Sequence, residues 1–450
     1  MINKALKALA VFLFLHVSLY GQQLEKRIDS LVKSYISDDG SGIAIIVKKE
    51  GNILYHKAFG KANVELGVDM QPSHVFRIGS VTKQFTACAI LKLAEENKLT
   101  LQDDIHKYLP DYPTQNHKIT IEHLLTHTSG IKSYTDLPEW TEEVRRKDFE
   151  PLDLIKTFQR DELDFPPGEK FKYNNTGYFI LGYIIEKASG MSYPDYIKET
   201  FFKPLKMMNS YYGSSTQIIP NRASGYQKNA DGKLQNANYL SMTQPYSAGS
   251  LLSTVEDLAK WNEAVFSYKV VSKESLKKAH TPYKLNNGNE TGYGYGWGIG
   301  TSLNKKTIQH GGGINGFLTQ STYFPEEDLH IAIFSNCLCF SPAELINPVA
   351  SFTLGIPLGR KEVKLSVDKL KKLTGEYQLS PTFSINITLE ENQLMAQATG
   401  QQKIPVFAEA ELLFFLKVVD AQLEFIEEGK KITGLYLHQG GMKQKANKIK

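Results

Sequence analysis

Cysteine is scarce in this chain, with three among 450 residues. A chain of this length buries enough apolar surface to fold without disulfide bonds or a structural metal. The length also predicts two or three domains. Cys88 lies in an apolar stretch, whereas Cys337 and Cys339 follow a strand-like run. Positions i and i+2 of one strand rarely form a disulfide. We therefore interpret all three as structural residues.

An excess of charge of one sign is also missing. Lys and Arg number 52 against 48 Asp and Glu, a formal net charge of +4. This is too small to favour nucleic acid or an anionic membrane as the partner. No run of about 18 uninterrupted apolar residues occurs, so no stable membrane span is expected. The 41% hydrophobic and 22% charged composition is that of a globular protein.

The first 21 residues have the pattern of a secretory signal peptide. Lys4 and Lys7 precede the apolar run 9–17, and Gly21 offers a small residue for cleavage. The run is too short to span a bilayer comfortably. We expect export to the periplasm or the extracellular space, with an uncleaved membrane anchor as the alternative.

The body of the chain, residues 22–356, alternates between strand-like and helical patterns. Apolar periodicity first predicts strands at 43–47 and 53–59. It then predicts helices at 80–99, 175–187 and 254–266, and strands again at 317–324 and 329–334. This order predicts one large α+β unit.

The character of the sequence changes after a candidate linker at 357–365. Strict alternation at 383–389 and 394–398, with turn residues between, predicts a small all-β domain over residues 366–441. The last residues, 442–450, carry four lysines, and we expect a frayed, solvated end.

Several widespread motifs are absent or incomplete. The chain has no GxxxxGK[ST] phosphate loop and no Gly-x-Ser-x-Gly elbow, which disfavours an α/β-hydrolase. The glycines of 311–316 have dinucleotide-binding spacing, but a strand follows them instead of a helix. His123 and His127 have the spacing of helical zinc ligands, but Leu124 stands where a metalloprotease needs Glu. We interpret both histidines as helix-packing residues.

Ser80 and Lys83 are the first candidate catalytic pair. On a helix they share one face, which puts an amine beside a hydroxyl. They open the most apolar helical stretch, where burial would lower the pKa of the amine so that it acts as a base. Ser-x-x-Lys also occurs elsewhere, for example at Ser30 and Lys33. The alternative is a helix-capping Ser80 with a solvated Lys83.

Tyr173 and Asn175 follow the loop 165–169, which is rich in Pro and Gly and would present side chains to a ligand. A tyrosine beside an ammonium group can serve as a base or a proton shuttle, and an amide can bind the substrate or the lysine. The alternative is a core tyrosine followed by a helix-capping asparagine.

His310 precedes three glycines, Gly311, Gly312 and Gly313. Glycines leave backbone N–H groups open to a ligand, so one of them could donate to an oxyanion while His310 lines the pocket. The alternative is a Gly-rich hairpin turn.

Taken together and in this order, the three segments resemble the serine β-lactamase and penicillin-binding-protein superfamily. Further segments are similar to its class C-like branch, which includes D-aminopeptidases, DD-peptidases and carboxylesterases: 75–86, 124–130, 165–168 and 293–298. The resemblance implies an α/β sandwich, with an antiparallel sheet flanked by helices, and an all-helical lobe. The end of the chain resembles the lipocalin-like barrel appended to some members of this branch.

The resemblance also implies roles for the candidate residues. Ser80 would be acylated, Lys83 and Tyr173 would move protons, and Asn175 would position the substrate and Lys83. The reaction would be acyl transfer and then hydrolysis, without metal or cofactor. The substrate would be a small molecule or a short peptide, and the oligomeric state stays open.

The backbone N–H groups of Ser80 and Gly313 would form the oxyanion hole, and His310 would supply polar or positive character opposite Tyr173. Efficient β-lactamases have Lys where this chain has His310, and Thr or Ser where it has Gly311. Losing a hydrogen bond to a charged substrate group costs about 1.5–3 kcal/mol. We therefore favour a D-residue peptidase or aminopeptidase, or a carboxylesterase. The alternatives are a β-lactamase or D-Ala-D-Ala carboxypeptidase and, secondly, a non-catalytic penicillin-binding-like sensor.

Overall fold

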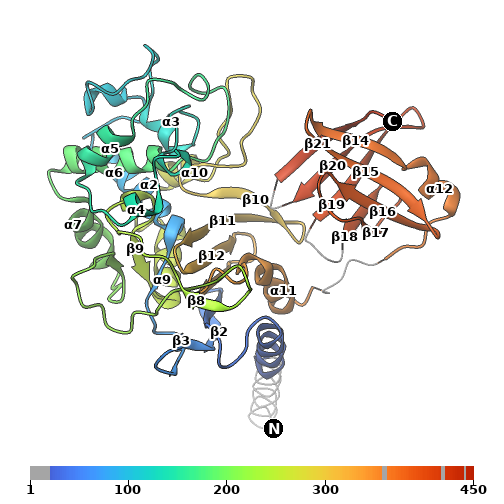
Figure 1. Ribbon diagram of the computed structural model, residues 1–450, viewed down its shortest axis with the longest axis horizontal. Coiled ribbons are helices and arrows are strands. Elements are labelled where there is room, and N and C mark those ends of the chain that lie inside the picture. Colours follow the sequence, from blue (N-terminus) through green and yellow to red (C-terminus); the bar gives the residue numbers. More distant parts are fainter. Residues whose placement is uncertain (1–20, 357–361, 417–420, 440–441) are drawn as a thin grey trace, which may run out of the picture. The chain divides into compact units, whose positions relative to one another are not determined.

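The computed structural model describes residues 21–356, 362–416, 421–439 and 442–450 (Figure 1). The chain divides into two compact units, the first ending at Thr353 and the second made of Leu354–Lys450 together with the short segment Gly300–Ser302. The expected signal peptide lies outside the described residues apart from Gly21, and so does most of the expected linker. Among the helices that are described, none has the length and apolarity needed to cross a membrane.

A six-stranded antiparallel sheet in the order β10-β11-β12-β13-β1-β2 is the centre of the first unit (Figure 1). Its strands are β1 (Ile43–Lys49), β2 (Asn52–Phe59), β10 (Gly298–Ser302), β11 (Lys305–Ile314), β12 (Phe317–Phe324) and β13 (Leu329–Ser335). Strand β1 pairs with β13 from the far end of the unit, with Ile45 opposite Ile333. Every residue of β13 is buried, so both faces of this central pair are covered.

Helices and short turns fill the chain between β2 and β10. They are η1 (Gly79–Val81), α2 (Thr82–Glu95), η2 (Ile105–Lys107), α3 (Ile121–Leu125), η3 (Tyr134–Asp136), α4 (Glu142–Arg145), α5 (Pro151–Phe158), α6 (Asn175–Ser189), α7 (Tyr193–Ile197), η4 (Lys198–Phe202), α8 (Tyr246–Gly249), α9 (Val255–Phe266) and α10 (Lys273–Ala279). Residues 21–33 are also helical, and α11 (Ala343–Leu354) follows the sheet.

Short strands join these helices. They are β3 (Lys61–Asn63), β4 (Val68–Asp69), β5 (Phe76–Arg77), β6 (Tyr211–Tyr212), β7 (Tyr226–Lys228), β8 (Leu234–Asn236) and β9 (Leu251–Ser253). Strand β9 lies between β5 and β6 and ties the segment before η1 to the segment after α8.

The predicted helix at 80–99 is confirmed in type, but it starts with a 3-10 turn and ends at Glu95. Most of α2 is buried, because it packs between α6, α8 and α9. The Phe85 ring of α2 stacks on the Trp261 ring of α9, with centroids 3.9 Å apart. The apolar surface all around α2 therefore has a partner on each side.

The second unit is a closed antiparallel barrel of eight strands, β14 to β21, preceded by α12 (Val367–Lys372). The strands are β14 (Gly375–Ser380), β15 (Phe383–Glu390), β16 (Gln393–Ala398), β17 (Ile404–Ala408), β18 (Leu413–Leu416), β19 (Ala421–Glu428), β20 (Lys431–Gln439) and β21 (Met442–Lys448). Together the two units confirm the expected α+β architecture with an appended β-barrel.

The expectation of a frayed end at 442–450 is wrong. Strand β21 pairs with β20 on one side and with β14 on the other, and so closes the barrel. Ala446 is fully buried opposite Leu435, whereas Lys443 and Lys445 are exposed. A strand with one small inward residue carries almost no hydropathy signal. Its position is set by the open backbone groups of the two neighbouring strands, which it covers.

The interpretation of Cys337 and Cys339 as unpaired is also wrong, because they form a disulfide. They lie in the turn after β13, where their Cα atoms are 5.1 Å apart. Two residues of an extended strand would span about 6.6 Å. The turn therefore brings the thiols into bonding range. Cys88 is buried and free.

We expect Gly130→Ala to destabilise the first unit more than Gly190→Ala. Both glycines have a positive φ, 74° and 73°, so both substitutions carry the same backbone strain of about 1–2 kcal/mol. A Cβ at Gly130 would lie 1.8 Å from the carbonyl oxygen of Phe165, whereas nothing lies within 4 Å at Gly190. The clash should add about 1–3 kcal/mol, measured by urea unfolding. Equal losses would show that the contact with Phe165 costs nothing to relax.

Candidate active site

Ser80 lies on η1, between β5 and α2. Gly79 before it has φ +51°, and a Cβ there would lie 2.9 Å from the backbone nitrogen of Gly313 on β11. Only glycine permits this approach. The Ser80 side chain makes no cap hydrogen bond, so the alternative of a helix-capping serine is wrong.

Lys83 is completely buried in the first turn of α2, three residues after Ser80. Its Nζ lies 3.1 Å from Ser80 Oγ, 2.9 Å from Asn175 Oδ1 and 2.9 Å from the carbonyl oxygen of Ala248 on α8. Burial holds the pKa of Lys83 well below its usual value. A neutral amine fits these partners, because it donates to the two oxygens of Asn175 and Ala248 and accepts the Ser80 hydroxyl proton.

Asn174 and Asn175 divide the two roles that the sequence left open for one asparagine. Asn174 caps α6, because its Oδ1 accepts the N–H of Gly177 at 2.8 Å. Asn175 is therefore free to bind Lys83, and its Nδ2 donates to Thr135 Oγ1 at 3.2 Å.

Tyr173 completes the group at the mouth of the site, with 38% of its surface exposed. Its ring centroid lies 4.8 Å from Lys83 Nζ. Burial around its hydroxyl raises the pKa of Tyr173 above the usual value, and the hydrogen bond to Ser80 opposes that change. The phenol is therefore protonated at neutral pH, which disfavours a phenolate base.

His310 lies within β11, not in a hairpin turn, and pairs with Ser321 of β12. Its Nδ1 donates to the carbonyl oxygen of Gly311 at 2.6 Å, so its Nε2 accepts from the Tyr293 hydroxyl at 2.8 Å. Burial lowers the pKa of His310 to about 3. The residue therefore contributes polarity and no positive charge.

The glycines after His310 serve close packing as well as backbone exposure. A Cβ at Gly312 would lie 2.1 Å from the carbonyl oxygen of Ile78, the residue two before Ser80. At Gly313 the nearest heavy atom would be Leu318 Cδ2, at 3.4 Å. Gly312 therefore lets β11 lie directly against the chain that carries Ser80, and this holds the backbone of Gly313 beside Gly79.

His127 is the site residue whose place the sequence reasoning missed. Helix α3 ends at Leu125, and His127 has φ +59°, so it does not share a helix face with His123. Its ring centroid lies 4.3 Å from that of Tyr173, and its Nδ1 accepts the Asn174 N–H at 3.0 Å. Burial lowers the pKa of His127, so the ring is neutral. The His127 ring therefore packs against the Tyr173 ring.

Of two other groups at the site, the sequence pointed to one, Tyr293, and not to the other, the backbone carbonyl of Ala248. Tyr293, which bonds His310, stands in the segment 293–298 that suggested the superfamily. The carbonyl oxygen of Ala248 gave no side-chain signal at all. Across the part of the chain that the structure describes, no group of three or more His, Cys, Asp or Glu side chains could hold a metal ion.

Two family models match the chain. Residues 24–347 match the model described as beta-lactamase. Residues 359–448 match a model described as a domain of unknown function, DUF3471.

Individual proteins are similar over one or both units. Penicillin-binding protein 4* of Bacillus subtilis is 28% identical over 431 residues, which cover 90% of this chain and 94% of that protein. The solved octameric penicillin-binding protein homologue from Pyrococcus abyssi is 29% identical, with a TM-score of 0.66 over 94% of this chain and 99% of its own. A D-stereospecific amidohydrolase from Streptomyces, 24% identical, shares the fold with a TM-score of 0.63 over 73% and 97%.

We expect Lys83→Met to change how the free energy of unfolding depends on pH. Because burial lowers the pKa of Lys83 in the folded protein, the unfolded chain binds a proton that the folded chain lacks. The resulting penalty is complete below the lowered folded pKa, and it fades as the pH rises from there to the unfolded pKa of about 10.4. As the pH rises, the native protein should therefore gain stability relative to the Lys83→Met variant, by at most about 1.4 kcal/mol per pH unit.

Urea unfolding of both proteins between pH 7 and pH 10 measures this difference. Lys92→Met, at the far end of the same helix, controls for loss of a lysine side chain. A stability difference that stays constant with pH would contradict a lowered pKa for Lys83.

Proposed function

This chain belongs to the beta-lactamase family, and we propose that it is an exported serine hydrolase with Ser80 as its nucleophile. One observation carries the proposal: the buried amine of Lys83 lies 3.1 Å from Ser80 Oγ. A serine needs a base within hydrogen-bond reach, and an amine with a lowered pKa is such a base. A sensor without catalysis would have no need to bury a lysine at this cost.

The proposed acylation begins when Lys83 takes the proton from the Ser80 hydroxyl. Ser80 Oγ then attacks the carbonyl carbon of the substrate, and the backbone N–H groups of Ser80 and Gly313 receive the oxyanion. Tyr173 gives its phenol proton to the leaving group, and the proton on Lys83 returns to Tyr173. Water hydrolyses the acyl-enzyme by the reverse proton path.

The opposite pKa shifts of Lys83 and Tyr173 support this division of roles. The lowered pKa of Lys83 favours its role as the base, and the raised pKa of Tyr173 keeps the phenol proton in place until the leaving group takes it. Asn175 holds the amine, and His127 and Tyr293 hold the rings of Tyr173 and His310.

For the substrate, we propose an amide or peptide of a D-residue, or a carboxylic ester. His310 is neutral, and Gly311 offers no hydroxyl, so neither residue supplies the charge or the hydroxyl that would bind a carboxylate on the leaving side. A Cβ at Gly311 would lie 2.9 Å from Gln320 Oε1, so Gln320 occupies the space of the absent side chain. The fold shared with a D-stereospecific amidohydrolase suggests the same substrate class.

We expect a fluorophosphonate probe to label the protein covalently at Ser80. The Ser80→Ala variant should show no adduct by intact-protein mass spectrometry, because the nucleophile is gone. Ser275→Ala is the matched control, since Ser275 and Lys278 repeat the Ser-x-x-Lys spacing on α10. An equal adduct on Ser80→Ala, or none on the folded native protein, would contradict the assignment and favour the sensor alternative.

We expect p-nitrophenyl esters or D-amino acid amides to be hydrolysed with a higher kcat/KM than nitrocefin. The missing hydrogen bond to a substrate carboxylate should cost roughly 10- to 150-fold for the β-lactam. Steady-state rates on the three substrates, with Ser80→Ala as the blank, measure the order. Nitrocefin as the best substrate would show that His310 and Gly311 do not exclude β-lactamase activity.

A further inference from the structure

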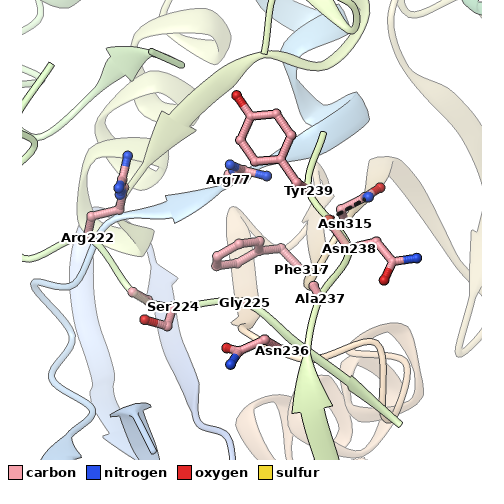
Figure 2. Close-up of a pocket in the computed structure, with 11 residues that line it drawn as sticks. Arg77, Arg222, Ser224, Gly225, Asn236, Ala237, Asn238, Tyr239, Asn315 and Phe317 are labelled. Atoms are coloured by element: carbon pink, nitrogen blue, oxygen red, sulfur yellow. Dashed lines mark hydrogen bonds between the residues drawn. The ribbon is translucent and has the colours of Figure 1, made fainter. Parts of the chain in front are cut away.

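A pocket of about 320 Å³ lies beside the proposed oxyanion hole (Figure 2). Its walls come from β5, from residues 222–225 and 236–239, and from the turn between β11 and β12. This volume lies within the range of small-molecule sites. The proposed catalytic residues do not line it, so it is a separate compartment of the first unit.

Two arginines give this pocket its charge. Arg77 on β5 and Arg222 both line it, and Arg222 runs beside Val75, two residues before Arg77. No acidic side chain is among the described residues that line the pocket. Glu65, which bonds Asn236 at its edge, already accepts the hydroxyl of Tyr226.

The positive charges of the two guanidinium groups repel each other. Burial and the charge of Arg222 lower the pKa of Arg77 to about 10. A cation that is buried beside another cation is costly unless an anion joins them. The Phe317 ring, 5.9 Å from Arg77 Cζ, forms an apolar part of the pocket wall beside this guanidinium group.

Fixed amides surround the same space. Asn315 Nδ2 donates to the carbonyl oxygen of Asn238 at 2.8 Å, which ties the β11–β12 turn to the segment 236–239. Figure 2 shows Asn238 and Asn315 together on the side of the pocket away from Arg222, and Asn236 separately, near Gly225. A planar anion with two acceptor oxygens matches guanidinium groups in this setting.

The position of the pocket decides which part of a substrate reaches it. Arg77 precedes Ser80 by three residues, and Asn315 follows Gly313 by two, a reach of at most about 7 Å. Along β11 in the other direction, His310 lies about 10 Å from Gly313. The Tyr173 ring is at that end, with its centroid 6.2 Å from that of His310.

Since Tyr173 protonates the leaving group in the proposed mechanism, the leaving group lies towards His310, and the acyl group extends the opposite way. We propose that Arg77 and Arg222 bind a carboxylate carried by the acyl part of the substrate. The preferred substrates are then esters or amides of an acid with a second, free carboxylate. This inference rests on the proposed function of Ser80.

The test compares matched chromogenic esters on the full-length protein. The p-nitrophenyl monoester of glutaric acid carries a free carboxylate on the acyl side, and its methyl ester lacks that charge. A further pair, the butyrate esters of p-nitrophenol and of 3-carboxy-4-nitrophenol, places the carboxylate on the leaving side instead. The measured quantity is the ratio of kcat/KM within each pair, which cancels any general loss of activity.

We expect the native protein to prefer the glutaric monoester over its methyl ester by about 10-fold or more. Arg77→Gln should remove most of this preference. Arg222→Gln should reduce it less and make it less sensitive to salt, because Arg222 is exposed and its charge is screened. Arg27→Gln, on the helix at 21–33, removes the same charge outside the pocket and should keep the native ratio.

The outcomes separate this inference from the proposed function. If no ester is hydrolysed in a Ser80-dependent way, the proposed function fails. If hydrolysis depends on Ser80 but the free acid is not preferred, or both arginine variants keep the preference, the carboxylate site is overturned. A preference confined to the leaving-side pair would also overturn it. Should Arg77→Gln not fold, the exposed position Arg222 decides the question alone.

Discussion

The buried amine of Lys83 is the constraint on which the site depends. It has no contact with solvent and no acidic partner, and it is held by Ser80, Asn175 and the backbone of Ala248. Removing an amine from water lowers its pKa at the expense of folding stability. The apolar packing of α2 against α6, α8 and α9 supplies the stability that offsets this cost. The same packing that buries the helix therefore also lowers the pKa of the lysine in its first turn.

Close backbone contacts bring the other half of the site to this helix. Gly79 and Gly312 let β11 approach the segment before Ser80 more closely than any side chain would allow. Gly130 does the same for the loop that leads to Tyr173. Each contact joins residues that are far apart in the sequence. The site is thus assembled by glycine contacts and then fixed by polar groups.

Sequence reasoning located what short motifs and periodicity can encode. The apolar setting of Ser80 and Lys83 and the alternation in β15 and β16 were readable without a structure. His127 was not placed, because its role depends on where α3 ends. The Cys337–Cys339 disulfide depends on a turn, and β21 on the neighbours that it joins. A backbone carbonyl acceptor such as that of Ala248 has no side-chain signature, so only the folded chain reveals it.

The pairing of β1 with β13 has a consequence for how the chain is made. Ile43 pairs with Ser335, so the middle of the sheet joins the two ends of the first unit. During synthesis, β1 and β2 emerge early and can pair with each other, but the other edge of β1 has no partner until β13 has been translated. Such a high contact order implies slow folding and a long-lived nascent chain with exposed apolar strands. The first unit therefore has no shorter autonomous fragment at its N-terminal end, and the nascent chain needs protection until almost all of the unit has been made.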